Sequence, residues 1–88
     1  MRTTFVADNL DAIRDHFFYD RGAGVLTTSR GAKGCLRPDG YRIFKFRKRL
    51  VFAHVIAYAL TWGSVPKAIT FVDGDKGNLK PENLKESV

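Results

Sequence analysis

The sequence predicts an α+β fold in which an antiparallel β-hairpin packs on a central helix. Residues 41–53 alternate aromatic and basic side chains on both sides of a short basic turn, a pattern typical of paired strands. Residues 54–62 form an apolar run that is ended by Gly63 and Pro66, which indicates a buried helix. Apolar residues also recur at helical spacing within residues 9–18, which adds an N-terminal helix.

Length and composition predict one small folded domain, residues 1–88, without internal repeats. The chain is 44% hydrophobic and 12% aromatic, too apolar for a disordered protein. No apolar run approaches the ~18 residues of a membrane helix, and the first residues lack the apolar stretch of a signal peptide. Because Cys35 is the one cysteine, no internal disulfide and no cysteine zinc cluster are expected. These features predict a cytoplasmic location and no membrane partner.

The N-terminal helix is expected to run from Asn9 to Phe18. Asp8 is placed to cap it. Leu10, Ile13 and Phe17 then form one apolar stripe.

The rest of the chain alternates strand and turn signals. Cys35 is expected to pack as an inert strand residue. A three-residue turn is expected at Arg47–Arg49, and Pro81–Leu84 is expected to start a short helix. The expected strands are Val25–Thr28, Cys35–Leu36, Tyr41–Phe46, Leu50–Ala53 and Ala68–Val72.

Positive charge is concentrated in the middle of the chain. Residues 21–72 hold ten basic side chains against one acid, Asp39, whereas residues 1–20 and 73–88 are each slightly acidic. A basic block of this kind suits a polyanion, most simply nucleic acid. The side chains expected to contact nucleic acid or another partner are the cations of this block and the histidine that follows the hairpin: Arg30, Lys33, Arg37, Arg42, Lys45, Arg47, Lys48, Arg49 and His54.

Three stretches carry a resemblance to a known family: LDAIRDHFFYDRGAGVLTTSR, RPDGYRIFKFRKRLVFAHVIAYALTWGSVP and VDGDKGNLKPENL. In this order they resemble the small phage-type HNH homing endonucleases. The resemblance implies a hairpin and helix leading into a ββα-metal motif, and an activity of DNA nicking or cleavage. It divides the chain into an N-terminal helix and turn (1–24), a basic hairpin and helix (25–66) and a remnant of the ββα motif (67–88).

The resemblance also identifies the chain as a degenerate member. The family's catalytic Asp-His pair is replaced by Thr70 and Phe71, and neither side chain can act as an anionic ligand or a base. Asp73 and Asp75 occupy the turn that follows, and Asn83 matches the family's middle asparagine. The last motif residue, on the metal-binding helix, would lie beyond the end of the sequence. These replacements predict no catalytic residue, no metal and no other cofactor.

The sequence therefore predicts a catalytically inactive HNH-like protein that binds nucleic acid, with DNA favoured over RNA. One alternative is a phage-encoded inhibitor of a host or anti-phage defence complex, for example of CRISPR type, acting in the host cytoplasm. A second alternative is a residual metal-dependent DNA nickase, in which Asp73 and Asp75 hold a weak metal site.

Overall fold

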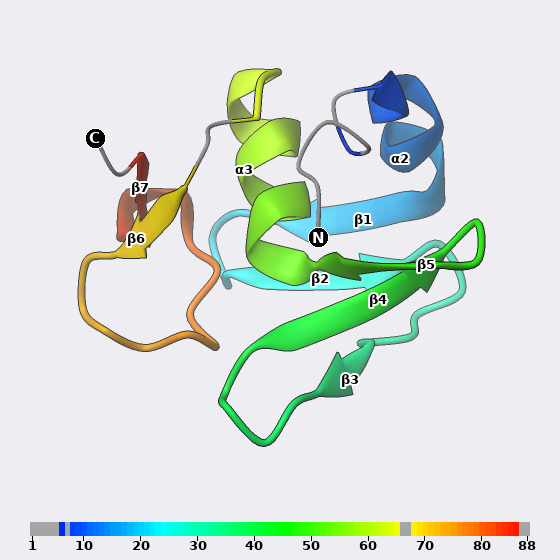
Figure 1. The fold of residues 1–88 in the computed structure, drawn as a ribbon. Coiled ribbons are helices and arrows are strands. Elements are labelled where there is room, and N and C mark those ends of the chain that lie inside the picture. Colours follow the sequence, from blue (N-terminus) through cyan, green and yellow to red (C-terminus); the bar gives the residue numbers. More distant parts are fainter. Residues whose placement is uncertain (1–5, 7, 66–67, 87–88) are drawn as a thin grey trace.

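The computed structural model describes residues 6, 8–65 and 68–86 (Figure 1). In chain order its elements are α2 (Leu10–His16), β1 (Phe17–Asp20), β2 (Val25–Thr28), β3 (Cys35–Leu36), β4 (Arg42–Phe46), β5 (Arg49–Phe52), α3 (Ala53–Trp62), β6 (Ile69–Phe71), the 3-10 turn η1 (Pro81–Asn83) and β7 (Leu84–Glu86). Every strand pair is antiparallel. The predicted α+β fold is confirmed. No helix in the described ranges is long and apolar enough to cross a membrane.

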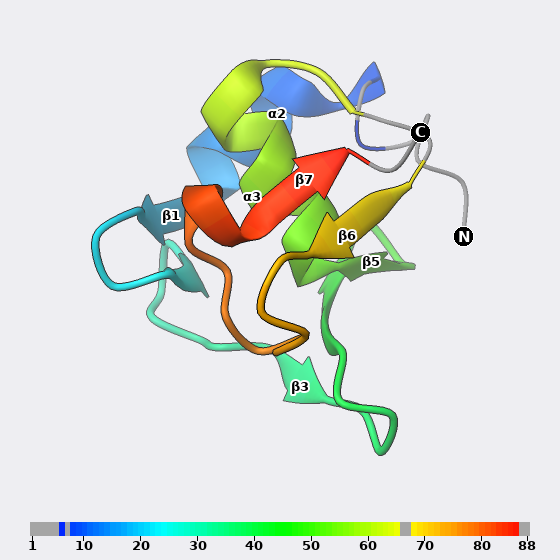
Figure 2. The same cartoon turned by 90° about the vertical axis from the view of Figure 1, so that its left-hand side faces the viewer.

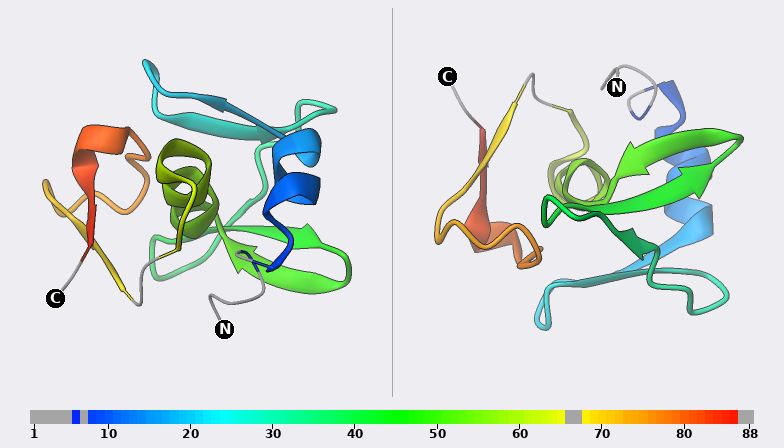
Figure 3. Two further views of the ribbon diagram at one scale, coloured as in Figure 1. Left: turned by 90° about the horizontal axis from the view of Figure 1, so that it is seen from above. Right: turned by 60° about the horizontal axis from the view of Figure 1, so that its bottom comes forward.

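The helix α3 lies at the centre of the molecule. Seen from above, the β6–β7 pair stands on one side of it and α2 on the opposite side (Figure 3, left). The pair β1–β2 and the sheet β3–β4–β5 cover the two remaining sides. Turned by 90°, the β6–β7 pair lies in front of α3 (Figure 2). The β6–β7 pair, hereafter the C-terminal hairpin, thus lies beside this helix.

The helix α3 follows its sequence pattern closely. It begins at Ala53, one residue before the predicted start, and ends at Gly63, whose left-handed φ of 73° closes the last turn. The N–H of Gly63 donates to the carbonyl of Ala59 at 2.8 Å. Most of its residues are buried, as expected of a helix covered on all sides.

The N-terminal helix is shorter than predicted. It ends at His16, because Phe17 and Phe18 belong to β1 and pair with Thr28 and Thr27 of β2. Aromatic residues favour strands when a partner strand is present, and this pairing outweighs the helical spacing. The predicted cap is also wrong: the N-cap is Asn9, without a side-chain cap bond.

The β4–β5 hairpin turns within two residues, one fewer than predicted. Phe46 pairs with Arg49, which leaves Arg47 and Lys48 as the turn. Both turn residues have positive φ, 50° and 65°. Such two-residue turns match the twist of the strands but favour Asn and Gly.

The hydrophobic core is built around α3 by buried side chains of α2, of α3 and of most strands. Phe44 and Val51 pair across the hairpin and both point inward, whereas Lys45 and Leu50 pair on the exposed face. Cys35 on the edge strand β3 is exposed, so the prediction that it packs is wrong. The buried core residues are Val6, Ile13, Phe17, Leu26, Phe44, Phe46, Val51, Ala53, Val55, Ile56, Ala57, Ala59, Leu79 and Leu84.

The predicted helical start at Pro81–Leu84 is wrong beyond Asn83. The 3-10 turn η1 ends there, and Leu84 begins β7 by pairing with Phe71 of β6. Leu84 is buried in this position. Burial of its side chain and pairing of its backbone favour a strand where the local sequence indicates a helix.

Candidate nucleic-acid interface

Asn83 organises the loop between β6 and η1. Its side chain is almost fully buried, and its Oδ1 accepts a hydrogen bond from the N–H of Asp73 at 2.8 Å. Its Nδ2 donates to the carbonyl of Asn78 at 3.0 Å. Its own carbonyl accepts from the N–H of Val72 at 2.9 Å. Asn83 therefore fixes the backbone that follows β6 from three directions.

The two carboxylates of this loop shape the turn. Asp73 accepts from the N–H of Asp75 at 2.7 Å through Oδ1 and from the amide of Asn78 at 2.9 Å through Oδ2. These bonds, that of Asn78 first, lower the pKa of Asp73. Asp75 in turn accepts from the N–H of Gly77 at 2.9 Å. Both side chains serve as turn acceptors.

The residues present do not fit the divalent ion that an HNH site implies. Both carboxylate oxygens of Asp73 already accept hydrogen bonds within the loop. Across residues 6, 8–65 and 68–86, no three His, Cys, Asp or Glu side chains gather where an ion could bind. Thr70 and Phe71 supply no anionic oxygen at the strand end. No chemical step through a metal follows from this arrangement.

Phe71 belongs to a cluster of four rings: Tyr41, Phe52, His54 and Phe71, hereafter the ring cluster. The centroids of Phe71 and His54 lie 5.1 Å apart, and those of Tyr41 and Phe71 lie 6.1 Å apart. Phe52 is 5.4 Å from Tyr41 and 5.3 Å from His54. These separations are typical of favourable aromatic packing. Phe71 stands where the resemblance places a catalytic histidine, and its ring packs against other rings.

His54 is the inner member of the ring cluster. It is 9% exposed at the start of α3, and burial lowers its pKa from 6.5 to about 4. The ring is therefore neutral at pH 7. Its predicted contact with nucleic acid stays a prediction, one that this burial disfavours.

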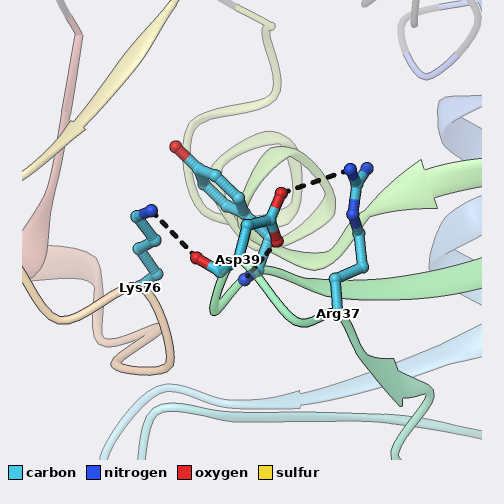
Figure 4. Close-up of polar contacts among 4 residues, drawn as sticks. Arg37, Asp39 and Lys76 are labelled. Atoms are coloured by element: carbon cyan, nitrogen blue, oxygen red, sulfur yellow. Dashed lines mark hydrogen bonds and ion pairs between the residues drawn. The ribbon is translucent and has the colours of Figure 1, made fainter.

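Asp39, the one acid of the central block, joins the hairpin to the C-terminal loop (Figure 4). Its carboxylate pairs with Arg37 at 3.2 Å and accepts from the N–H of Tyr41 at 3.2 Å. Its carbonyl accepts from Nζ of Lys76 at 2.9 Å. The same ammonium lies 4.5 Å from the ring centroid of Tyr41, and the Arg37 guanidinium lies 5.6 Å from that of Phe52. Two cations thus flank the ring cluster.

Four predicted contact residues lie together at the end of the hairpin: Lys45, Arg47, Lys48 and Arg49, hereafter the tip cations. All four are exposed. Arg47 donates to Oδ1 of Asn9 at 2.9 Å and lies over the ring of Phe46 at 5.4 Å. A groove of about 490 Å³ separates the tip from α2; its lining includes Lys45, Arg47 and His16.

The other cations of the block lie elsewhere. Arg42 donates to the carbonyl of Lys33 at 3.0 Å, and both residues line a smaller pocket beside Leu26 of β2. Arg30 is exposed in the preceding loop. Arg42 and Lys45 are three positions apart on β4, so their side chains point to opposite faces of the strand. The predicted basic block is therefore divided into separate groups.

Sequence reasoning missed two parts of this surface. Lys76 lies in the slightly acidic C-terminal segment, and its contacts are to Asp39 and Tyr41, far away in the sequence. The second part is the ring cluster, in which Tyr41 and Phe52 are partly buried. The aromatic side chains were visible in the sequence, but their meeting with Phe71 depends on how β6 docks.

Comparison with known proteins supports the resemblance for the C-terminal part of the chain. Residues 51–87 match a family model described as HNH endonuclease. This range includes the second half of β5, all of α3 and the β6–β7 pair with its loop. No curated protein and no solved structure gave a match. Residues 51–87 are thus similar to the HNH endonucleases, and the phage-type, degenerate assignment stays a prediction.

The match corrects one prediction. The sequence predicted that the chain is not an enzyme, because Thr70 and Phe71 replace the expected acid and base. The family matched by residues 51–87 is one of endonucleases and points to a nuclease. The prediction of a non-enzyme is therefore wrong by this comparison, although the catalytic groups have no counterpart at positions 70 and 71.

Proposed function

We propose, from the relationship of residues 51–87 to the HNH endonucleases, that this chain binds DNA and that the tip cations contact its phosphates. The observation that carries the proposal is the exposed position of Lys45, Arg47, Lys48 and Arg49 around one two-residue turn. Cations that contact phosphates release counterions, which supplies affinity without sequence specificity.

The backbone of the turn supports this role. Arg47 and Lys48 adopt positive φ, a conformation that costs about 1 kcal/mol or more for residues with a side chain. Asn and Gly would adopt it more readily, yet the sequence places two cations there. Arg47 is held by the neutral amide of Asn9, which orients its guanidinium without cancelling its charge.

The shape of the hairpin favours DNA over RNA. The major groove of B-DNA is wide enough for a two-stranded β-ribbon. The major groove of A-form RNA is deep and narrow and excludes it. A twisted ribbon with cations at its tip therefore fits duplex DNA better than duplex RNA.

Fluorescence anisotropy with a labelled DNA duplex tests the proposal between about 50 and 200 mM salt. We expect Lys48→Ala to weaken binding to all sequences and to reduce the slope of log K against log salt by about 1. Lys85→Ala, which removes an exposed cation from β7, is the matched control and should leave binding within about twofold.

Two results would overturn the proposal. One is an absence of duplex binding at about 50 mM salt. The other is an equal loss of affinity in the Lys48→Ala and Lys85→Ala variants. Stoichiometric capture of a protein from nuclease-treated lysate, with no DNA binding, would instead favour the inhibitor role.

A second candidate function is cleavage of the bound DNA, which the match to endonucleases favours. This candidate predicts nicking of supercoiled plasmid by the purified protein and loss of nicking in Asn83→Ala. The assay compares Mg²⁺, Mn²⁺ and EDTA, because the loop does not by itself form a divalent-ion site. The Thr70→Asp/Phe71→His double variant should nick faster than the natural sequence. Equal plasmid profiles with and without protein, in every buffer, would exclude this candidate.

A further inference from the structure

Three of the four rings in the ring cluster keep part of their surface in contact with solvent. Tyr41, Phe52 and Phe71 are each half-buried, whereas His54 lies beneath them and is 9% exposed. The three partly exposed rings come from the residue before β4, from β5 and from β6. Docking of the C-terminal hairpin thus creates one aromatic surface from segments distant in sequence.

We propose that the ring cluster is a stacking site for unpaired bases of single-stranded DNA. This proposal rests on the DNA binding proposed above and extends it to a second part of the surface. Bases stack on exposed aromatic side chains with little dependence on sequence, because every base has a π-face.

The packing of the cluster prepares its rings for stacking. Tyr41, Phe52 and Phe71 are each held against His54, with centroids 5.1–5.4 Å from it. Rings held in this way lose little freedom when a base is added, so less of the stacking energy is spent on ordering. His54 is neutral at pH 7 and supports the rings as an aromatic neighbour.

Two cations lie over rings of the cluster. Nζ of Lys76 is 4.5 Å from the centroid of Tyr41 and is held by the carbonyl of Asp39. The guanidinium of Arg37 is 5.6 Å from the centroid of Phe52, on the other side of Asp39 (Figure 4). Cations and aromatic rings on one surface are the combination that single-strand binders use. In duplex DNA the base faces are covered, so the cluster selects unpaired segments.

The test compares two labelled oligonucleotides of about ten nucleotides with the same number of phosphates. One carries adenine at every position and the other is abasic throughout. We expect the natural protein to bind the adenine strand about tenfold more tightly than the abasic strand. Phe71→Leu, which keeps an apolar side chain but removes the ring, should bring this ratio close to one and leave duplex binding unchanged.

Phe18→Leu is the matched control, since Phe18 is 66% exposed on β1 outside the ring cluster. It should keep the tenfold preference. In NMR spectra, the ring protons of Tyr41 and Phe71 should shift upfield when the adenine strand is added. Circular dichroism of both variants establishes that they are folded.

Equal binding of the adenine and abasic strands by the natural protein would overturn the stacking proposal while leaving duplex binding intact. An equal effect of Phe18→Leu and Phe71→Leu on the ratio would overturn it as well. A failure to bind any oligonucleotide, duplex included, would overturn the proposed function and the stacking proposal together.

Discussion

Asn83 and Asp73 are joined by a hydrogen bond of 2.8 Å from the backbone N–H of Asp73 to the side-chain oxygen of Asn83. The bond ties the 3-10 turn before β7 to the loop that follows β6. Because Asn83 is 4% exposed, water cannot replace its contacts.

The first prediction concerns the stability that this contact provides. Asn83→Ala leaves the N–H of Asp73 and the carbonyl of Asn78 without their side-chain partner. We expect a loss of about 2–4 kcal/mol in the free energy of unfolding, measured by urea denaturation. Glu82→Ala, a neighbouring exposed position, should change it by less than about 0.5 kcal/mol. A similar small effect at both positions would show that the bonds of Asn83 contribute little.

The second prediction separates charge from backbone strain at the hairpin turn. Arg47→Asn/Lys48→Gly places favoured residues at the two positive φ positions and should raise the free energy of unfolding by about 1–2 kcal/mol. The same double variant should bind DNA more weakly, since two tip cations are lost. Arg47→Ala/Lys48→Ala is the control: it should weaken binding equally without the gain in stability. Unchanged melting temperature in the Asn-Gly variant would contradict the strain argument.

The third prediction is a pH dependence of stability that originates in His54. Its pKa in the folded state is about 4, below the 6.5 of the unfolded chain, because burial disfavours the charged ring. The contribution of the neutral ring is therefore complete above pH 6.5 and is lost as the pH falls from 6.5 to about 4. The loss should be on the order of 3 kcal/mol.

Urea denaturation across this pH range provides the measurement, with His54→Phe as the comparison. The variant should show little change between pH 6.5 and 4. The pKa of Asp73 is lowered below 3.8, so its charged form stabilises the fold above this pH. That stabilisation is lost only at more acidic pH, outside the range measured here. An equally steep fall in the natural protein and in His54→Phe would assign the pH dependence to other groups.

The fourth prediction uses two glycines of the loop between β2 and β3. Gly31 and Gly34 both have positive φ, 87° and 75°, so alanine is strained at either position. A Cβ at Gly31 meets no atom within 4 Å, whereas one at Gly34 meets the carbonyl oxygen of Ile43 and the ring of Phe44. Gly31→Ala should cost about 1 kcal/mol and Gly34→Ala clearly more, as measured by thermal unfolding. Equal melting temperatures of the Gly31→Ala and Gly34→Ala variants would show that the loop shifts at Gly34 to accommodate the added methyl group.

The sequence was most informative where the signal was local. Gly63 ends α3 through its own backbone conformation, and the alternation of Lys45 with buried aromatic residues places the hairpin faces correctly. The local sequence could not predict that α2 ends at His16 and that β1 begins at Phe17. Its helical spacing and its strand propensity conflict, and the pairing with β2 decides between them.

The candidate site was less predictable, because it depends on contacts between distant segments. Leu84 forms a strand because Phe71 is available as its partner, and this pairing is absent from the local sequence of Pro81–Leu84. The ring cluster and the position of Lys76 likewise depend on contacts between residues far apart in the sequence. The identity of Thr70 and Phe71 was visible from the start, whereas the surroundings of Phe71 required the fold.

The bond from Lys76 to Asp39 also affects the order in which the protein folds. It closes a separation of 37 residues on an exposed surface, and the hydroxyl of Tyr19 makes a similar long-range bond to the carbonyl of Leu79. Contacts of high sequence separation are entropically costly and form after local ones. The hairpin β4–β5 and the helix α3 should therefore form first, and β6–β7 should dock last. The same segment should open first in the native state, so its amides should exchange with solvent faster than those of α3.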